Sequence, residues 1–227
     1  MTLLILRLEG ALQSWGEHSK WDDRDTGSFP TKSGVIGLIA CAMGLPRESN
    51  EIAHIAARLR MSVRADRPGT VLNDYHTVQG MPDILNSEGS PRSANTIVST
   101  RRYLQDASFL VVLSGPDDLL LRCFNALRDP VWQTYLGRKA CIPSLPLMPV
   151  LTDKYSSVDD ALCHFAVSDR CKLTSLLCMI EEADATGERV DQPRGHRQFA
   201  RRHFNYRRVK IEMEEEEQTH VSDKAES

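Results

Sequence analysis

Residues 26–43 read TGSFPTKSGVIGLIACAM, a polar loop that runs directly into an apolar segment rich in small residues. Thr31 or Ser33 can cap the N-terminus of a helix, and Gly44, closely followed by a proline, can end it. The pattern therefore predicts a helix over residues 33–43.

The start of this predicted helix is a candidate anion site. Free N–H groups and the positive end of the helix dipole converge at a helix N-terminus, and the Lys32 ammonium would join them. Thr31, Lys32 and Ser33 are accordingly expected to hold a phosphate of a nucleic-acid backbone. A well-capped core helix without a ligand is the alternative interpretation.

A nucleotide-hydrolase P-loop is excluded. The G-x-x-x-x-G-K-[ST] pattern needs two glycines, and Thr26 and Thr31 occupy their positions here. Pro30 also removes one N–H from the loop that would surround the phosphates.

Outward from this helix, strand-like and helix-like segments alternate. Residues 60–65 alternate as a half-buried strand does, and a Gly-Pro-Asp-Asp turn at residues 115–118 opens a further helix. The expected elements are a strand at 3–8, helices at 33–43 and 51–59, strands at 60–65 and 109–114, a helix through 127, and an extended, proline-rich segment at 137–147. This βαββαβ-like order is typical of the ferredoxin-like fold, which includes many RNA-binding modules but does not fix a function.

A long insertion separates the second and third of these strands, at about residues 67–105. Its flanks, residues 73–78 and 96–103, are predicted to pair as a projecting hairpin. Tyr75, Arg101, Arg102 and Tyr103 could then clamp a nucleic-acid strand. The alternative is a surface ribbon with incidental arginines.

The C-terminal part contains two opposed charge blocks. Residues 189–210 carry seven arginines and one lysine against the single acid Asp191, with Phe199, Phe204 and Tyr206 among them. Arginines interleaved with aromatic rings suit unpaired bases and their phosphates. A strand or helix face neutralised by acidic neighbours is the alternative. Acidic residues follow at once, and residues 212–227 are predicted to form a disordered tail.

Composition sets broad limits. The chain has 227 residues with 41% apolar content, enough to bury a core. No apolar run approaches the roughly 20 residues of a membrane span, so a cytoplasmic protein without membrane contact is expected. The six cysteines include no C-x-x-C pair, which disfavours a metal site or a disulfide framework, and no cofactor is expected.

Several blocks together resemble the CasD family, the RAMP-type subunits of the type I-E CRISPR interference complex Cascade. These blocks are LRLEGALQSWG (6–16), FPTKSGVIGLIACAMGL (29–45), YHTVQG (75–80), STRRYLQDASFLVVL (99–113) and YLGRKACIPSLPL (135–147). They occur in the family's order, and the resemblance extends to about residue 210.

The resemblance implies an α+β protein. Its parts would be an RRM-like ferredoxin (RAMP) core in residues 1–115 with a hairpin thumb at 67–105, the rest of the core with a small, reduced β-rich domain in 116–211, and the tail.

The resemblance also implies a non-catalytic role in antiviral defence. The chain would bind the 5′ handle of the CRISPR RNA (crRNA), cap one end of the Cascade backbone, and contact a backbone subunit and the large PAM-reading subunit, meeting target DNA only through the complex. The residues implied to contact RNA are Arg24, Thr31, Lys32, Ser33, Tyr75, His76, Arg101, Arg102, Tyr103, Arg138, Lys139 and Arg201.

Two other functions stay open at this stage. A metal-independent endoribonuclease that cuts the repeat would need a base and an acid or cation, for which His76, Tyr75 and Lys32 are the candidates. Neighbouring strand residues point to opposite faces, however, which disfavours joint action of Tyr75 and His76. A purely protein-binding scaffold is the third interpretation.

Overall fold

A computed structural model describes residues 1–80, 84–85, 88–91, 96–169, 171, 175–194 and 204–215. The helices are α1 (Lys32–Ala42), α2 (Glu51–Arg58), α3 (Asp117–Arg128) and α4 (Val158–His164). The strands are β1 (Leu3–Glu9), β2 (Leu12–Gln13), β3 (Asp23–Arg24), β4 (Arg60–Arg67), β5 (Thr70–Gln79), β6 (Thr96–Gln105), β7 (Ser108–Ser114), β8 (Val150–Thr152), β9 (Ser175–Glu181), β10 (Gly187–Pro193) and β11 (Phe204–Glu215).

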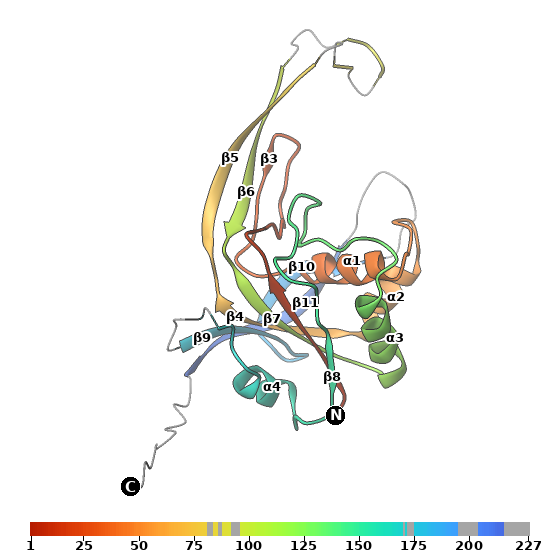
Figure 1. Cartoon of the computed structure of the whole chain (residues 1–227), viewed down its shortest axis with the longest axis vertical. Helices are drawn as coiled ribbons and strands as arrows, with labels where there is room; N and C mark the ends of the chain where they lie inside the picture. Colours follow the sequence, from red (N-terminus) through yellow and green to blue (C-terminus); the bar gives the residue numbers. More distant parts are fainter. Residues whose placement is uncertain are drawn as a thin grey trace, which may run out of the picture.

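One antiparallel sheet of seven strands forms the body of the molecule, in the order β10-β11-β9-β4-β7-β1-β8 (Figure 1). Residues 3–152 follow the chain path β1-α1-α2-β4-β7-α3-β8, which has the expected βαββαβ order, but the last strand is Val150–Thr152 and residues 137–147 contain no strand. The α+β class is therefore confirmed. The expected helix at 33–43 is α1, with the Thr31 hydroxyl accepting a hydrogen bond from the Gly34 amide as its N-cap.

Both faces of this sheet are covered. Side chains alternate along β1, so Leu4, Leu6 and Leu8 pack with α1, α2 and α3 while Leu3 and Ile5 pack with α4. Strand β4, expected to be half-buried, is buried from its second residue to its seventh because α4 covers its other face. There Arg64 donates hydrogen bonds to the backbone carbonyls of the last turn of α4 and to Asp66, which neutralises a charge that is fully buried.

The C-terminal strands extend the same sheet. Strand β9 pairs with β4, and β11 pairs with β9 and β10. Strands β9 to β11 therefore add to the edge of the core sheet and do not form a second sheet. The prediction that residues 212–227 are disordered is wrong for residues 212–215. Residues 212–215 belong to β11 and pair with residues 175–178 of β9. Residues 216–227 lie outside the described part.

The predicted hairpin forms and projects from the body (Figure 1). Strands β5 and β6 pair in register without a bulge, from Thr70 opposite Gln105 to Gln79 opposite Thr96. Gly69 begins it at φ 75°, a backbone conformation that favours glycine, and a Cβ there would lie 2.7 Å from the Gln105 carbonyl oxygen. Strands β2 and β3 pair with β6 on its other side and tie the hairpin to the body.

No helix in the described part is long and apolar enough to cross a membrane.

Candidate nucleic-acid interface

The start of α1 is not the open anion site expected from the sequence. The Lys32 amide donates to the Asp191 carboxylate at 2.8 Å, so an internal anion from β10 already occupies the helix N-terminus. The Lys32 side chain is only 1% exposed, and its ammonium contacts Glu181 at 2.8 Å. The expectation that Lys32 and the helix amides converge on an external phosphate is therefore corrected. Thr31 is also buried, so its hydroxyl, which caps the helix, does not contact an external phosphate either.

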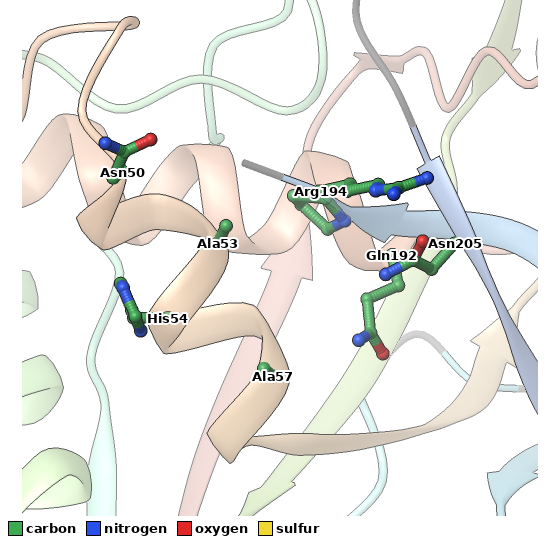
Figure 2. A pocket seen from close by; sticks show the side chains of 8 residues that line it. Asn50, Ala53, His54, Ala57, Gln192, Arg194 and Asn205 are labelled. Carbon is green, nitrogen blue, oxygen red and sulfur yellow. The ribbon is translucent and has the colours of Figure 1, made fainter. Parts of the chain in front are cut away.

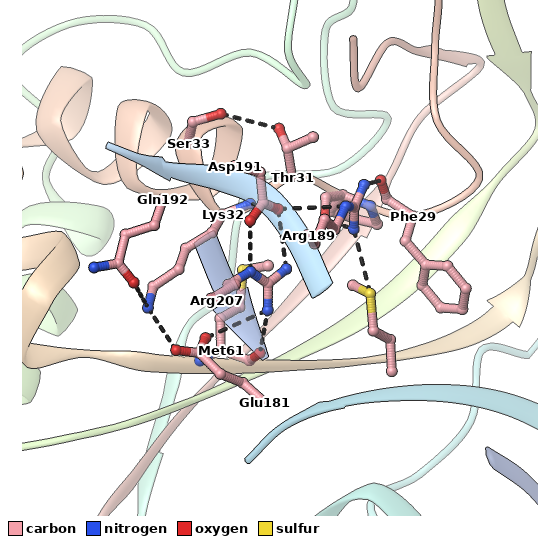
Figure 3. Close-up of polar contacts among 12 residues, drawn as sticks. Phe29, Thr31, Lys32, Ser33, Met61, Glu181, Arg189, Asp191, Gln192 and Arg207 are labelled. Carbon is pink, nitrogen blue, oxygen red and sulfur yellow. Dashed lines mark hydrogen bonds and ion pairs between the residues drawn. The ribbon is translucent and has the colours of Figure 1, made fainter. Parts of the chain in front are cut away.

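Two arginines of the basic segment at residues 189–210, Arg189 and Arg207, belong to the same network (Figure 3). Arg207 donates two hydrogen bonds to the Asp191 carboxylate, from Nε at 2.6 Å and from Nη2 at 3.0 Å. Arg189 donates to the Phe29 and Pro30 carbonyls and pairs with Glu17. Both arginines are buried and do not face RNA: Arg189 joins β10 to the loop before α1, and Arg207 joins β11 to β10.

The network shifts two pKa values. Burial lowers the pKa of the Lys32 ammonium, although Glu181 acts in the opposite direction. Burial alone would raise the pKa of the Asp191 carboxyl, but hydrogen bonds from Arg207, its charge and that of Arg189 bring this pKa below the ordinary value. Asp191 is therefore held as a carboxylate at neutral pH.

The base of the hairpin carries an accessible cluster of cations. Strand β3 places Arg24 beside Arg101 of β6, and Asp74 of β5 lies opposite Arg101. His76 lies opposite Ser99, two residues along, and so on the same face. Arg24 is exposed and Arg101 is partly exposed. Within the described residues neither arginine forms an ion pair, although Asp74 lies opposite Arg101 and its carboxylate is 3.7 Å from the His76 ring.

Arg138 completes this cluster. Its guanidinium lies 4.8 Å from the centre of the Tyr103 ring, and its Nη2 donates to the carbonyls of Arg24 and Asp25. Its Nη1 is buried and has no hydrogen-bond partner among the described residues. We call Arg24, Arg101 and Arg138 the basic face. Arg138 as a whole is partly exposed, so its positive charge acts at the surface beside Arg24 and Arg101, although Nη1 itself is buried.

Gly137 sets the position of Arg138. Its φ is 87°, and a Cβ there would lie 1.7 Å from the Ser14 carbonyl oxygen. Gly137→Ala is therefore expected to destabilise the protein by at least about 1 kcal/mol and to move Arg138 from Tyr103. Thermal unfolding and RNA titration would measure both effects. Gly37→Ala is the control, because nothing lies within 4 Å of the Cβ it adds. Wild-type behaviour of Gly137→Ala would contradict the role given to this turn.

Other expected contact residues lie elsewhere. Tyr103 is only 6% exposed and serves as the platform under Arg138, so it cannot stack on a base. Arg102 points to the opposite face of the hairpin, where it pairs with Asp23 at 3.2 Å. Tyr75, 70% exposed, shares that opposite face.

Ser33 is half-buried, with its hydroxyl 3.3 Å from that of Thr31. Lys139 is exposed beside Arg138, and Arg201 lies outside the described residues.

Acidic residues around Arg24 were not anticipated. Asp25 accepts hydrogen bonds from the Ser19 hydroxyl and the Glu17 and His18 amides, and so shapes the loop before β3. Burial would raise the pKa of Asp25, but these hydrogen bonds lower it. The DDRD sequence at residues 22–25 was the available signal, since an arginine between aspartates in a turn-rich stretch suggests local carboxylate bonds to the backbone.

The three catalytic candidates are not brought together. Tyr75 and His76 lie on opposite faces of β5, as their adjacency predicted. Lys32 is buried against Glu181 and Gln192. Within the described residues no three His, Cys, Asp or Glu side chains are placed to hold a metal ion.

With this geometry, the comparisons define the class of protein. The family model "CRISPR-associated protein (Cas_Cas5)" matches residues 3–210, so the chain belongs to this family of CRISPR-associated proteins. A curated relative is the CRISPR system Cascade subunit CasD of Escherichia coli (strain K12), which is 34% identical over 156 residues, 63% of this chain and 68% of CasD.

Two solved structures agree. A chain of a "CRISPR RNA-guided surveillance complex" is 31% identical with a TM-score of 0.77, over 94% of this chain and 90% of that one. A "Crystal structure of Cas protein" is 34% identical with a TM-score of 0.69, over 95% of this chain and 96% of the other.

Proposed function

We propose that this chain is a non-catalytic Cascade subunit that binds the 5′ handle of the crRNA as a single strand and caps one end of the complex. The observation that carries the proposal is the basic face. Arg24, Arg101 and Arg138 gather at the base of the hairpin, where Arg24 is exposed and the other two arginines are partly exposed. Guanidinium groups are suited to phosphate oxygens, with which they form charge-assisted hydrogen bonds.

The fold supports an RNA-binding assignment. The strand order β8-β1-β7-β4 with helices on one face fits a ferredoxin-like, RRM-like RAMP core. In this proposal residues 1–115 and the following helix and strand form that core, and β9 to β11 are the reduced C-terminal domain fused to its sheet. The hairpin is the thumb, and Lys139 adds a cation beside Arg138.

The exposed apolar side chains of the hairpin support contact with protein neighbours. Val71, Leu72, Tyr75, Val78 and Val98 are all more than one third exposed. Such surfaces are typical of interaction sites. We assign them to a Cascade backbone subunit, with the large PAM-reading subunit as a second neighbour, target DNA met through the complex, and the cytoplasm as the location.

The proposed function is tested by co-expressing this chain with its operon neighbours and a CRISPR array, then sequencing the 5′ ends of the RNA that copurifies. A single repeat-derived 5′ end in a particle of fixed stoichiometry is the expected result. Absent RNA, or RNA with heterogeneous ends, would favour the scaffold function, in which the basic surfaces meet acidic proteins.

The endoribonuclease alternative predicts a different outcome for one variant. His76→Ala should leave repeat cleavage intact, because the other two catalytic candidates are not beside it: Tyr75 lies on the opposite face of β5 and Lys32 is buried. Gel analysis of repeat RNA in cells expressing the variant would measure this. Accumulation of uncut repeat RNA would establish the enzymatic function instead, and Tyr75→Phe is the matched control on the other face.

A further inference from the structure

An open pocket of about 360 Å³ lies between α2 and the strands β10 and β11 (Figure 2). None of its lining residues belongs to the basic face, which is built from β3, β6 and the turn at residues 137–138. The volume falls in the range of small-molecule sites. The pocket therefore has room for a ligand of its own.

The sequence of α2 explains the hollow. Ala53 and Ala57 are four residues apart and so lie on one face of the helix, which the pocket borders. Their short side chains leave space that longer residues at these positions would fill. His54 and Asn50 lie on the same wall (Figure 2).

The opposite wall presents hydrogen-bond donors. The Gln192 Oε1 accepts from the Lys32 ammonium at 3.1 Å, and because an ammonium only donates, this bond fixes the amide orientation. The NH₂ group of Gln192 then points toward α2 (Figure 2). Arg194 is exposed and forms no ion pair within the described residues, and Asn205 faces the same space.

The charge of the lining selects a ligand class. It contains the Arg194 cation and no carboxylate, so an anionic group is favoured. The amides of Gln192, Asn205 and Asn50 offer both donors and acceptors, as the edge of a nucleobase requires.

We propose that this pocket binds one nucleoside monophosphate unit, with its phosphate at Arg194 and its base between Ala53 and Ala57 of α2 and the amides of Gln192 and Asn205. A free mononucleotide and one unit of a single strand share this chemistry. The buried network fixes Gln192 through Lys32, so the amide is oriented before the ligand arrives.

The test is calorimetric titration of the full chain with AMP, CMP, GMP, UMP and inorganic phosphate, and with a short single-stranded RNA. At least one nucleotide should bind saturably and more tightly than phosphate. Arg194→Ala should weaken its affinity about tenfold through loss of a charged hydrogen bond. Ala57→Leu should abolish binding by filling the pocket, and leucine is a good helix former that preserves α2.

Arg208→Ala is the matched control, since Arg208 is on the same strand as Asn205 but donates toward the Ala183 carbonyl and does not line the pocket. Loss of mononucleotide binding in the two pocket variants indicates a site for a free nucleotide. Loss confined to the oligonucleotide indicates one unit of a strand. Phosphate binding as tight as every nucleotide, or no change in either variant, would overturn the proposal. Arg101→Glu should weaken binding of handle RNA at the basic face but leave mononucleotide binding at the pocket unchanged. Failure of the pocket proposal and failure of the proposed function can therefore be told apart.

Discussion

Arg101→Glu together with Arg138→Glu is expected to lower the affinity for handle RNA at least a hundredfold. Each substitution removes a guanidinium from the basic face and adds a charge that repels phosphate. A charged hydrogen bond contributes about 1.5–3 kcal/mol, so the loss of two supports this magnitude. The salt dependence of binding should also become shallower, because fewer phosphates are neutralised. Fluorescence anisotropy with a labelled handle RNA over a range of salt concentrations would measure both effects.

The control for this experiment is Arg47→Glu, which changes an exposed arginine after α1 and outside the basic face. It should bind RNA as the wild type does. Among the described residues the Arg101 side chain makes one hydrogen bond, a 3.5 Å contact with the Ser99 hydroxyl, so its replacement should have little effect on folding. Equal loss of affinity in the control and the double variant would show that net charge, and not the basic face, governs binding.

Asp191→Ala is expected to cause the largest loss of stability. Asp191, 2% exposed, accepts from Arg207 and from the Lys32 amide and lies 3.4 Å from Arg189. Its removal leaves buried cations and a helix N-terminus without their anion, which costs about 3–5 kcal/mol. Urea unfolding followed by circular dichroism would measure the change. Asp153→Ala, at an exposed position, is the matched control, and equal midpoints for the two variants would contradict the structural role of the network.

The same carboxylate predicts the response to acid. The pKa of Asp191 in the folded state lies below 3.8, its ordinary value, so the unfolded state binds the proton more tightly. The stabilisation is therefore fully present above that value and is lost as the pH falls through the folded-state pKa. The difference in stability between wild type and Asp191→Ala should accordingly narrow on acidification below about pH 4. A constant difference down to pH 2 would show that Asp191 acts through packing alone.

Local patterns in the sequence predicted the elements well, because local chemistry sets them. Thr31 caps α1 as expected, and the flanks of the insertion pair as a hairpin. The burial of Lys32 and its ion pair with Glu181 could not be predicted in this way. Its partners Glu181 and Asp191 lie about 150 residues further along the chain, and no spacing rule connects them.

The candidate site was predicted only in part, for a related reason. Alternation along a strand separates Tyr75 from His76 and Arg101 from Arg102, and that much is readable from adjacency. The juxtaposition of Arg24, Arg101 and Arg138 depends on β3 pairing with β6 and on a cation–π contact with Tyr103. Tertiary contacts of this kind leave no periodic trace in the sequence.

Ultraviolet crosslinking of handle RNA to the assembled complex, with the crosslinked peptides of this chain identified by mass spectrometry, tests the basic face most directly. We expect crosslinks in the peptides that contain Arg24, Arg101 and Arg138, and their loss in the double glutamate variant. Crosslinks that fall only on α4 or at the start of α1, with none at the base of the hairpin, would contradict it.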